Sequence, residues 1–148
     1  MNNDEVIPET EDDYFQTTVS LEALVKALRN VKKFTYHVPY NSVNIITTKT
    51  AEELPKIPHF LSLDQFGISE IPETFDIQCF YGHIKENKKT QIFLGFSHKI
   101  SDEYKTRLQK IVDEILKTEN RDYKVPRIYF PGITRSSYDK METLHYQN

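Results

Sequence analysis

Apolar residues in the first half of the chain change from a helical to an alternating spacing. Within residues 20–33 they recur every three or four positions, which predicts a helix, and Ser20 is a favourable N-cap. Short runs rich in β-branched and aromatic residues predict strands over 34–38 and 42–48. We interpret residues 50–72, which contain three prolines and a glycine, as a long connection packed on the body of the fold.

The strongest alternation lies near the middle of the chain. Apolar side chains occupy mostly odd positions in residues 75–83 and mostly even positions in residues 92–100. Two antiparallel strands place both sets on one face only if an even number of residues joins them, which predicts a hairpin with its tip at 85–89. In that register, Phe80 faces Phe93 on the opposite side of the sheet.

The last third predicts a helix, a short strand and a final helix. Ser101 is the N-cap of the first helix, and residues 125–130 form the strand, for which Pro126 and Pro131 favour an edge position. Residues 135–148 form the final short helix. The whole order, α-β-β-β-β-α-β-α, predicts an α+β fold: a mixed or mostly antiparallel sheet of about five strands with two to three helices.

Composition and charge divide the chain unevenly. Leu, Ile, Val and Phe account for 41 of the 148 residues, which is enough for one core but leaves a polar domain. The net charge of −3 conceals an acidic start, since residues 1–13 hold six acids and no base. We therefore expect an acidic N-terminal arm over 1–16, a single domain over 17–133, and a tail or short helix over 134–148.

Several classes of chemistry lack support in the sequence. With only four glycines, the chain contains no dinucleotide-binding, P-loop, α/β-hydrolase or zincin motif. The single cysteine, Cys79, cannot form an intramolecular disulfide, and the spacing of the histidines favours no metal site. No apolar run is long enough to span a bilayer, and the acidic N-terminus is unlike a secretory signal. We expect a cytoplasmic protein with no cofactor, no metal and no membrane contact.

These observations favour a non-catalytic protein-binding module. We expect an inhibitor, immunity or accessory factor, of viral or bacterial type, that occupies another protein or a second copy of itself. Its support is the aromatic second face of the predicted sheet, the abundant tyrosine and the lysines of the predicted hairpin tip, which would steer the protein toward an acidic surface. The residues expected at the interface are Phe80, Phe93, Lys85, Lys88, Lys89, Arg127 and Tyr129.

Two alternatives remain open at this stage. One is a nucleic-acid-binding protein that uses the Lys85–Lys89 tip and the basic and aromatic residues of 121–135, and it predicts salt-dependent binding. The other is a small hydrolase or nucleotide-binding enzyme whose site is assembled from dispersed residues. Its histidine candidates are His37, His59 and His98.

Overall fold

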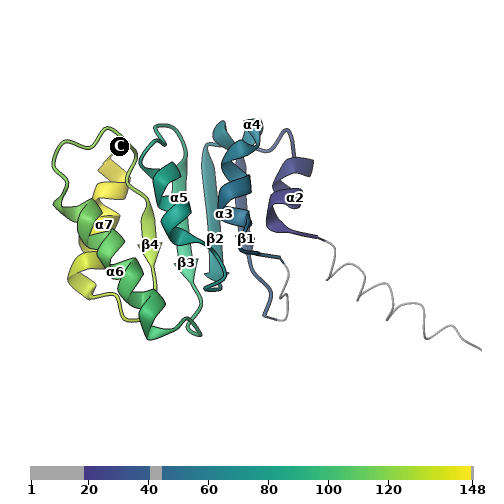
Figure 1. The fold of residues 1–148 in the computed structure, drawn as a ribbon. Coiled ribbons are helices and arrows are strands. Elements are labelled where there is room, and N and C mark those ends of the chain that lie inside the picture. The colour runs from purple at the N-terminus through teal and green to yellow at the C-terminus, as the bar shows by residue number, and fades with distance from the viewer. Residues whose placement is uncertain (1–18, 41–44, 148) are drawn as a thin grey trace, which may run out of the picture.

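The computed structural model describes residues 19–40 and 45–147, in which strands and helices alternate (Figure 1). The elements, in chain order, are α2 (Leu21–Ala27), β1 (Lys33–His37), α3 (Thr50–Glu53), the 3-10 helix η1 (Leu54–Lys56), α4 (Pro58–Leu61), β2 (Gln65–Ile71), α5 (Ile77–Ile84), β3 (Gln91–Phe96), α6 (Asp102–Lys117), β4 (Arg127–Tyr129) and α7 (Arg135–Gln147).

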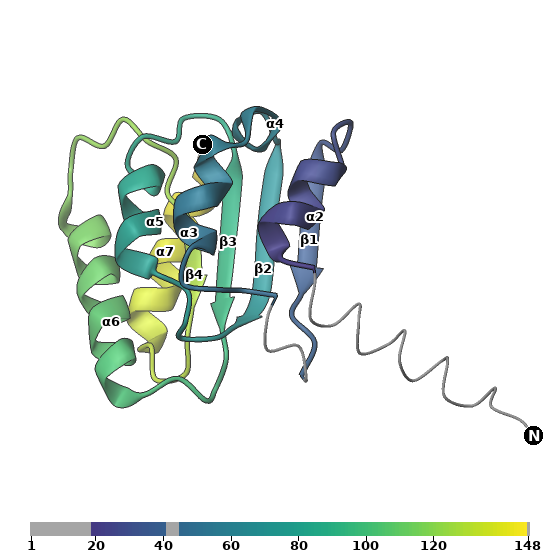
Figure 2. The same cartoon turned by 45° about the vertical axis from the view of Figure 1, so that its right-hand side comes forward.

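The sheet is entirely parallel, so the predicted α+β fold is wrong. Its four strands are ordered β1-β2-β3-β4, and six α-helices surround them within the part of the chain that the structure describes, which makes this an α/β fold. Each connection steps to the next strand in the same direction. Because such crossovers are right-handed, their helices return on one side of the sheet. Figures 1 and 2 show α3, α5 and α6 on that side, with α7 at the β4 end.

The largest correction concerns the predicted hairpin, whose first strand is helix α5. Four residues at helical spacing turn its apolar face into the core: Ile77, Phe80, Tyr81 and Ile84. The side chain of Asp76 caps the helix by accepting a hydrogen bond of 3.1 Å from the Cys79 amide. The alternation over 75–83 was misleading because Cys79, one of its odd positions, is exposed.

The second correction is strand β2, which lies inside the segment interpreted as a connection. Phe66, Ile68 and Ile71 of this strand are buried, and β2 pairs with β1 on one side and β3 on the other. The strand predicted over 42–48 is absent from residues 45–48, and the rest of it lies outside the described residues.

Other predicted elements are confirmed. The strand predicted over 34–38 is β1, and the helix after Ser101 is α6, in which the Ser101 hydroxyl accepts a hydrogen bond of 3.2 Å from the Tyr104 amide. Strand β4 occupies an edge of the sheet, as its flanking prolines predicted, and the final helix is α7. The arm expected over 1–16 lies outside the described residues, and no helix within those residues is long and apolar enough to cross a membrane.

The two faces of the sheet differ in character. The inner face, toward α3, α5 and α6, carries large side chains, and one row across the strands consists of Tyr36, Ile68, Leu94 and Ile128. The outer face is more polar, and in its neighbouring row the residues on β1 and β2 are small. That row consists of Thr35, Gly67, Phe93 and Arg127. Parallel sheets are usually covered on both faces. Here the polar outer face needs cover only near β4, which α7 provides.

Candidate functional site

A pocket of about 460 Å³ lies where the chain leaves the carboxyl ends of strands β1, β2 and β3. Its lining residues come from the last residues of β1 and β2 and from the segments that follow all three strands: His37, Val38, Pro39, Tyr40, Glu70, Pro72, Glu73, Thr74, Ser97, His98, Lys99 and Ile100. Parallel α/β proteins usually bind ligands at this end of the sheet, including barrels whose strands follow one another in sequential order. We therefore treat this carboxyl-end pocket as the candidate site.

A serine and a histidine meet at the carboxyl ends of β1 and β2, and of the two only the histidine lines the pocket. His37 ends β1 and is paired in register with Ser69 of β2. The Nδ1 atom of His37 lies 2.9 Å from the Ser69 hydroxyl oxygen, within hydrogen-bonding distance. Which of the two donates depends on the imidazole tautomer. The pair places a group that can accept or donate a proton beside a hydroxyl.

The backbone is strained at Glu70, the residue after Ser69. Its φ angle is +62°, in the left-handed region that a residue with a side chain rarely occupies. The register of β2 against β3 also shifts between Ile68 and Ile71, so the strand carries an irregularity at this point. The unusual turn brings Glu70 into the lining of the pocket. Strain of this kind concentrates at functional sites.

The loop after β3 forms the opposite side of the pocket. The Ser97 amide donates a hydrogen bond of 2.9 Å to the Ile71 carbonyl, which fixes the start of the loop against β2. Lys99 then reaches across the end of β2 to the segment after β1. Its Nζ lies 3.1 Å from the Tyr40 hydroxyl oxygen and 4.2 Å from the centre of the Tyr40 ring.

Charges are distributed unevenly around the pocket. Glu70 lies near the end of β2 and Glu73 just after it, whereas His98 and Lys99 follow β3. Glu73 also accepts a hydrogen bond of 2.6 Å from the Ser101 amide at the start of α6. The pocket therefore presents an acidic side and a basic side to the same volume.

The aromatic residues predicted from the sequence lie elsewhere. Phe80 is completely buried in α5, with its ring centre 5.3 Å from that of Phe75, so its predicted place on an open sheet face was wrong. Phe93 does lie on the outer face, half-buried beneath the Arg127 guanidinium at 4.9 Å. Tyr129, 44% exposed, packs edge-on against Tyr138.

The three predicted lysines occupy the turn between α5 and β3, at the amino end of the sheet. Lys88 lies 3.6 Å from Asp122, Lys89 lies 2.9 Å from Asp64, and the Nζ of Lys85 lies 4.6 Å from the Tyr81 ring centre. The turn is thus remote from the carboxyl-end pocket, and its lysines already have partners.

Of the three histidines considered for an enzyme, the structure brings two together. His37 and His98 both line the carboxyl-end pocket, whereas the Nε2 of His59 lies 2.6 Å from the Val25 carbonyl oxygen, away from it. Ser69 and Glu70 were missed because β2 was interpreted as a connection. The sequence could have identified them if residues 65–71 had been predicted as a strand, because the polar pair then follows Ile68 near the end of that strand.

The comparisons with known proteins add no relative. No family model, curated protein or solved structure matches this chain. Within the described residues, no group of three or more histidine, cysteine, aspartate or glutamate side chains could hold a metal ion.

Proposed function

We propose that the protein binds a small zwitterionic molecule of the amino-acid class in the carboxyl-end pocket. The observation that carries the proposal is the opposed charge of its walls, with Glu70 and Glu73 at the end of β2 and just beyond it, and His98 and Lys99 after β3. A ligand with an ammonium group and a carboxylate group would satisfy both sides, since hydrogen bonds between ionised partners are the strong ones.

The size of the pocket and the strain at its edge support the proposal. A volume of about 460 Å³ is in the range of small-molecule sites, which span roughly 300–1,000 Å³. Glu70 keeps a backbone conformation that costs on the order of 1 kcal/mol or more for a residue with a side chain. A role for its carboxylate in binding explains why glutamate rather than glycine occupies this position.

An NMR titration of the full chain with each of the twenty free amino acids tests the proposal. We expect at least one to shift the amide signals of His37, Glu70 and residues 97–99 at up to millimolar concentration. Glu70→Gln should weaken that binding about tenfold, as expected for one charge-assisted hydrogen bond. Glu119→Gln, an exposed change remote from the pocket, is the control.

The N-acetylated form of the same amino acid gives a sharper comparison, because it lacks the ammonium group. It should bind the unaltered protein about tenfold more weakly and should lose nothing further in Glu70→Gln. If no amino acid shifts these signals, or if Glu70→Gln and Glu119→Gln behave alike, the proposal fails.

Hydrolysis is a second candidate function, favoured by the bond between His37 and Ser69. A base within about 2.6–3.2 Å of a hydroxyl can accept its proton as the oxygen attacks a carbonyl carbon. Hydrolysis of p-nitrophenyl acetate should then be lost in both Ser69→Ala and His37→Ala and retained in Glu119→Gln. Equal rates in all three variants would eliminate this candidate.

A further inference from the structure

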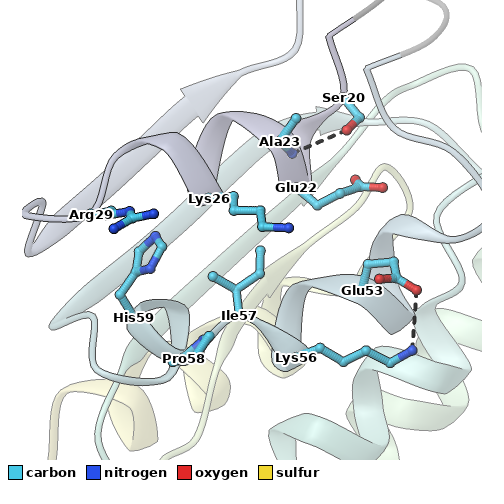
Figure 3. A pocket seen from close by; sticks show the side chains of 10 residues that line it. All are labelled: Ser20, Glu22, Ala23, Lys26, Arg29, Glu53, Lys56, Ile57, Pro58 and His59. Atoms are coloured by element: carbon cyan, nitrogen blue, oxygen red, sulfur yellow. Dashed lines mark hydrogen bonds and ion pairs between the residues drawn. The ribbon is translucent and has the colours of Figure 1, made fainter.

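A second concave surface lies on the helical side of the protein, between α2 and the segment formed by η1 and α4 (Figure 3). This groove measures about 640 Å³ and is lined by Ser20, Glu22, Ala23, Lys26, Arg29, Glu53, Lys56, Ile57, Pro58 and His59. The hydrogen bond from His59 Nε2 to the Val25 carbonyl oxygen, 2.6 Å long, joins α4 to α2 and holds the two sides of the groove together.

The groove combines apolar side chains with two basic side chains that form no ion pair within the described residues. Ala23, Ile57 and Pro58 supply the apolar part. Lys26 and Arg29 are exposed, and neither forms an ion pair with another residue in the described ranges. Figure 3 shows both on the α2 side of the groove, facing His59 and Ile57.

Each carboxylate that lines the groove has a hydrogen-bonding partner within the protein. Glu53 lies 3.3 Å from Lys56, and Glu22 accepts a hydrogen bond of 2.8 Å from the Thr50 hydroxyl. Lys56 offsets Glu53, whereas Glu22 keeps its charge, so the three basic side chains of the lining (Lys26, Arg29 and Lys56) exceed its two carboxylates by one. A complementary occupant carries carboxylates together with some apolar side chains.

We propose that this occupant is the acidic N-terminal segment of the same chain, residues 1–13. It contains six acids and no base, together with Val6 and Ile7 for the apolar part of the groove. The proposal concerns a surface separate from the carboxyl-end pocket and does not depend on the function proposed for that pocket.

The length of chain allows this contact. Ser20, which lines the groove, is separated from Asp13 by the six residues 14–19, which can span about 20 Å when extended. Lys26 lies six residues further along from Ser20, a rise of only about 9 Å in a helix. A short tether also gives the segment an effective concentration on the order of millimolar, so weak contacts suffice.

Paramagnetic NMR on the full chain tests the proposal directly. A nitroxide is attached at Thr10→Cys in a Cys79→Ser background, which removes the exposed native thiol. We expect broadening of the amide signals of Lys26, Arg29 and Ile57 at low salt. That broadening should fall several-fold near 1 M salt, where the screening length is about 3 Å.

Charge reversal distinguishes a specific contact from general attraction. The paired change Lys26→Glu and Arg29→Glu should reduce the broadening several-fold. The matched change Lys110→Glu and Lys117→Glu, on the exposed face of α6, should leave it unaltered. The spectrum of each variant also reports whether it remains folded.

Three results would overturn the proposal. One is broadening that is absent from the groove or spread evenly over basic surfaces, and another is broadening that survives the reversal of Lys26 and Arg29. The third is broadening that appears when nitroxide-labelled unenriched protein is mixed with unlabelled ¹⁵N-enriched protein, since the occupant would then be the segment of a second copy.

Discussion

Arg127 of β4 and Tyr138 of α7 form a two-pronged contact: the guanidinium Nε and Nη2 atoms lie 3.3 and 3.0 Å from the tyrosine hydroxyl oxygen. The same guanidinium lies 3.1 Å from the Tyr146 hydroxyl through Nη1 and covers the Phe93 ring. This arginine, predicted to bind a partner, thus fastens the last helix to the outer face of the sheet.

Arg127→Ala should therefore destabilise the protein. We expect the free energy of unfolding to fall by about 2 kcal/mol, since several hydrogen bonds to a charged group are lost. Arg127→Lys should recover only part of this loss, because an ammonium group cannot reproduce the planar fork. Urea unfolding followed by circular dichroism measures both. A loss of less than about 0.5 kcal/mol, as for an exposed substitution, would contradict this structural role.

Glu70→Gly should stabilise the fold by about 1 kcal/mol, because glycine adopts the positive φ angle of +62° without the penalty that a side chain imposes. The same change should abolish binding of the zwitterionic ligand in the carboxyl-end pocket. Thermal unfolding and the amino-acid titration check the two effects separately. Stability that falls in Glu70→Gly would show that the side chain matters for folding and would remove the argument from strain.

Phe80→Ala should cost about 3–5 kcal/mol, the range for a large aromatic side chain removed from a core. Phe93→Ala, at a half-buried position on the outer face, should cost only about 1 kcal/mol. Chemical denaturation of the two variants under the same conditions compares a core role with a surface role. Equal losses would contradict the placement of Phe80 in the core and Phe93 at the surface.

Half-buried His83 and buried His145 should make the protein less stable in mild acid. Burial lowers the pKa of His83 and of His145 below the ordinary value of 6.5. In each case the unfolded chain takes up protons at a higher pH than the folded protein does. Stability should consequently be full above 6.5 and should fall as the pH drops through 6.5 toward the lowered values.

His145→Gln isolates one of the two contributions. His145 is 8% exposed, and its Nδ1 lies 2.8 Å from the Val125 carbonyl oxygen. Urea unfolding between about pH 7.5 and pH 5.5 should show a shallower dependence of stability on pH in this variant than in the unaltered protein. Identical dependence in the two proteins would exclude a contribution from His145.

The elements that the sequence predicted correctly carry strong local signals. Helix α6 has a serine cap, acids in its first turn and an apolar stripe over four turns, and strand β1 is a compact aromatic run. Such signals do not depend on what the element packs against. For α5 and β2, in contrast, the packing of the whole fold decides the secondary structure, and the predictions for these two elements were wrong.

Helix α5 and strand β2 show why local sequence patterns can mislead. The buried positions Ile77, Phe80 and Ile84 fit a helix, yet the overlapping alternation of residues 75–83 fits a strand equally well, because an eight-residue segment contains few repeats of either period. Strand β2 has a glycine inside it and a left-handed residue near its end, both typical of a loop. Because the candidate pocket is built around that strand, the same error concealed Ser69 and Glu70.

The sequential order of the strands also bears on how the chain folds as it is synthesised. Each strand is hydrogen-bonded to the next one in the chain, and no later strand inserts between two earlier ones. During translation β2 can pair with a β1 that has already emerged, and β3 and β4 can add in turn at the free edge. Helix α7 follows β4 in the chain and packs against this strand, at which the growth of the sheet stops.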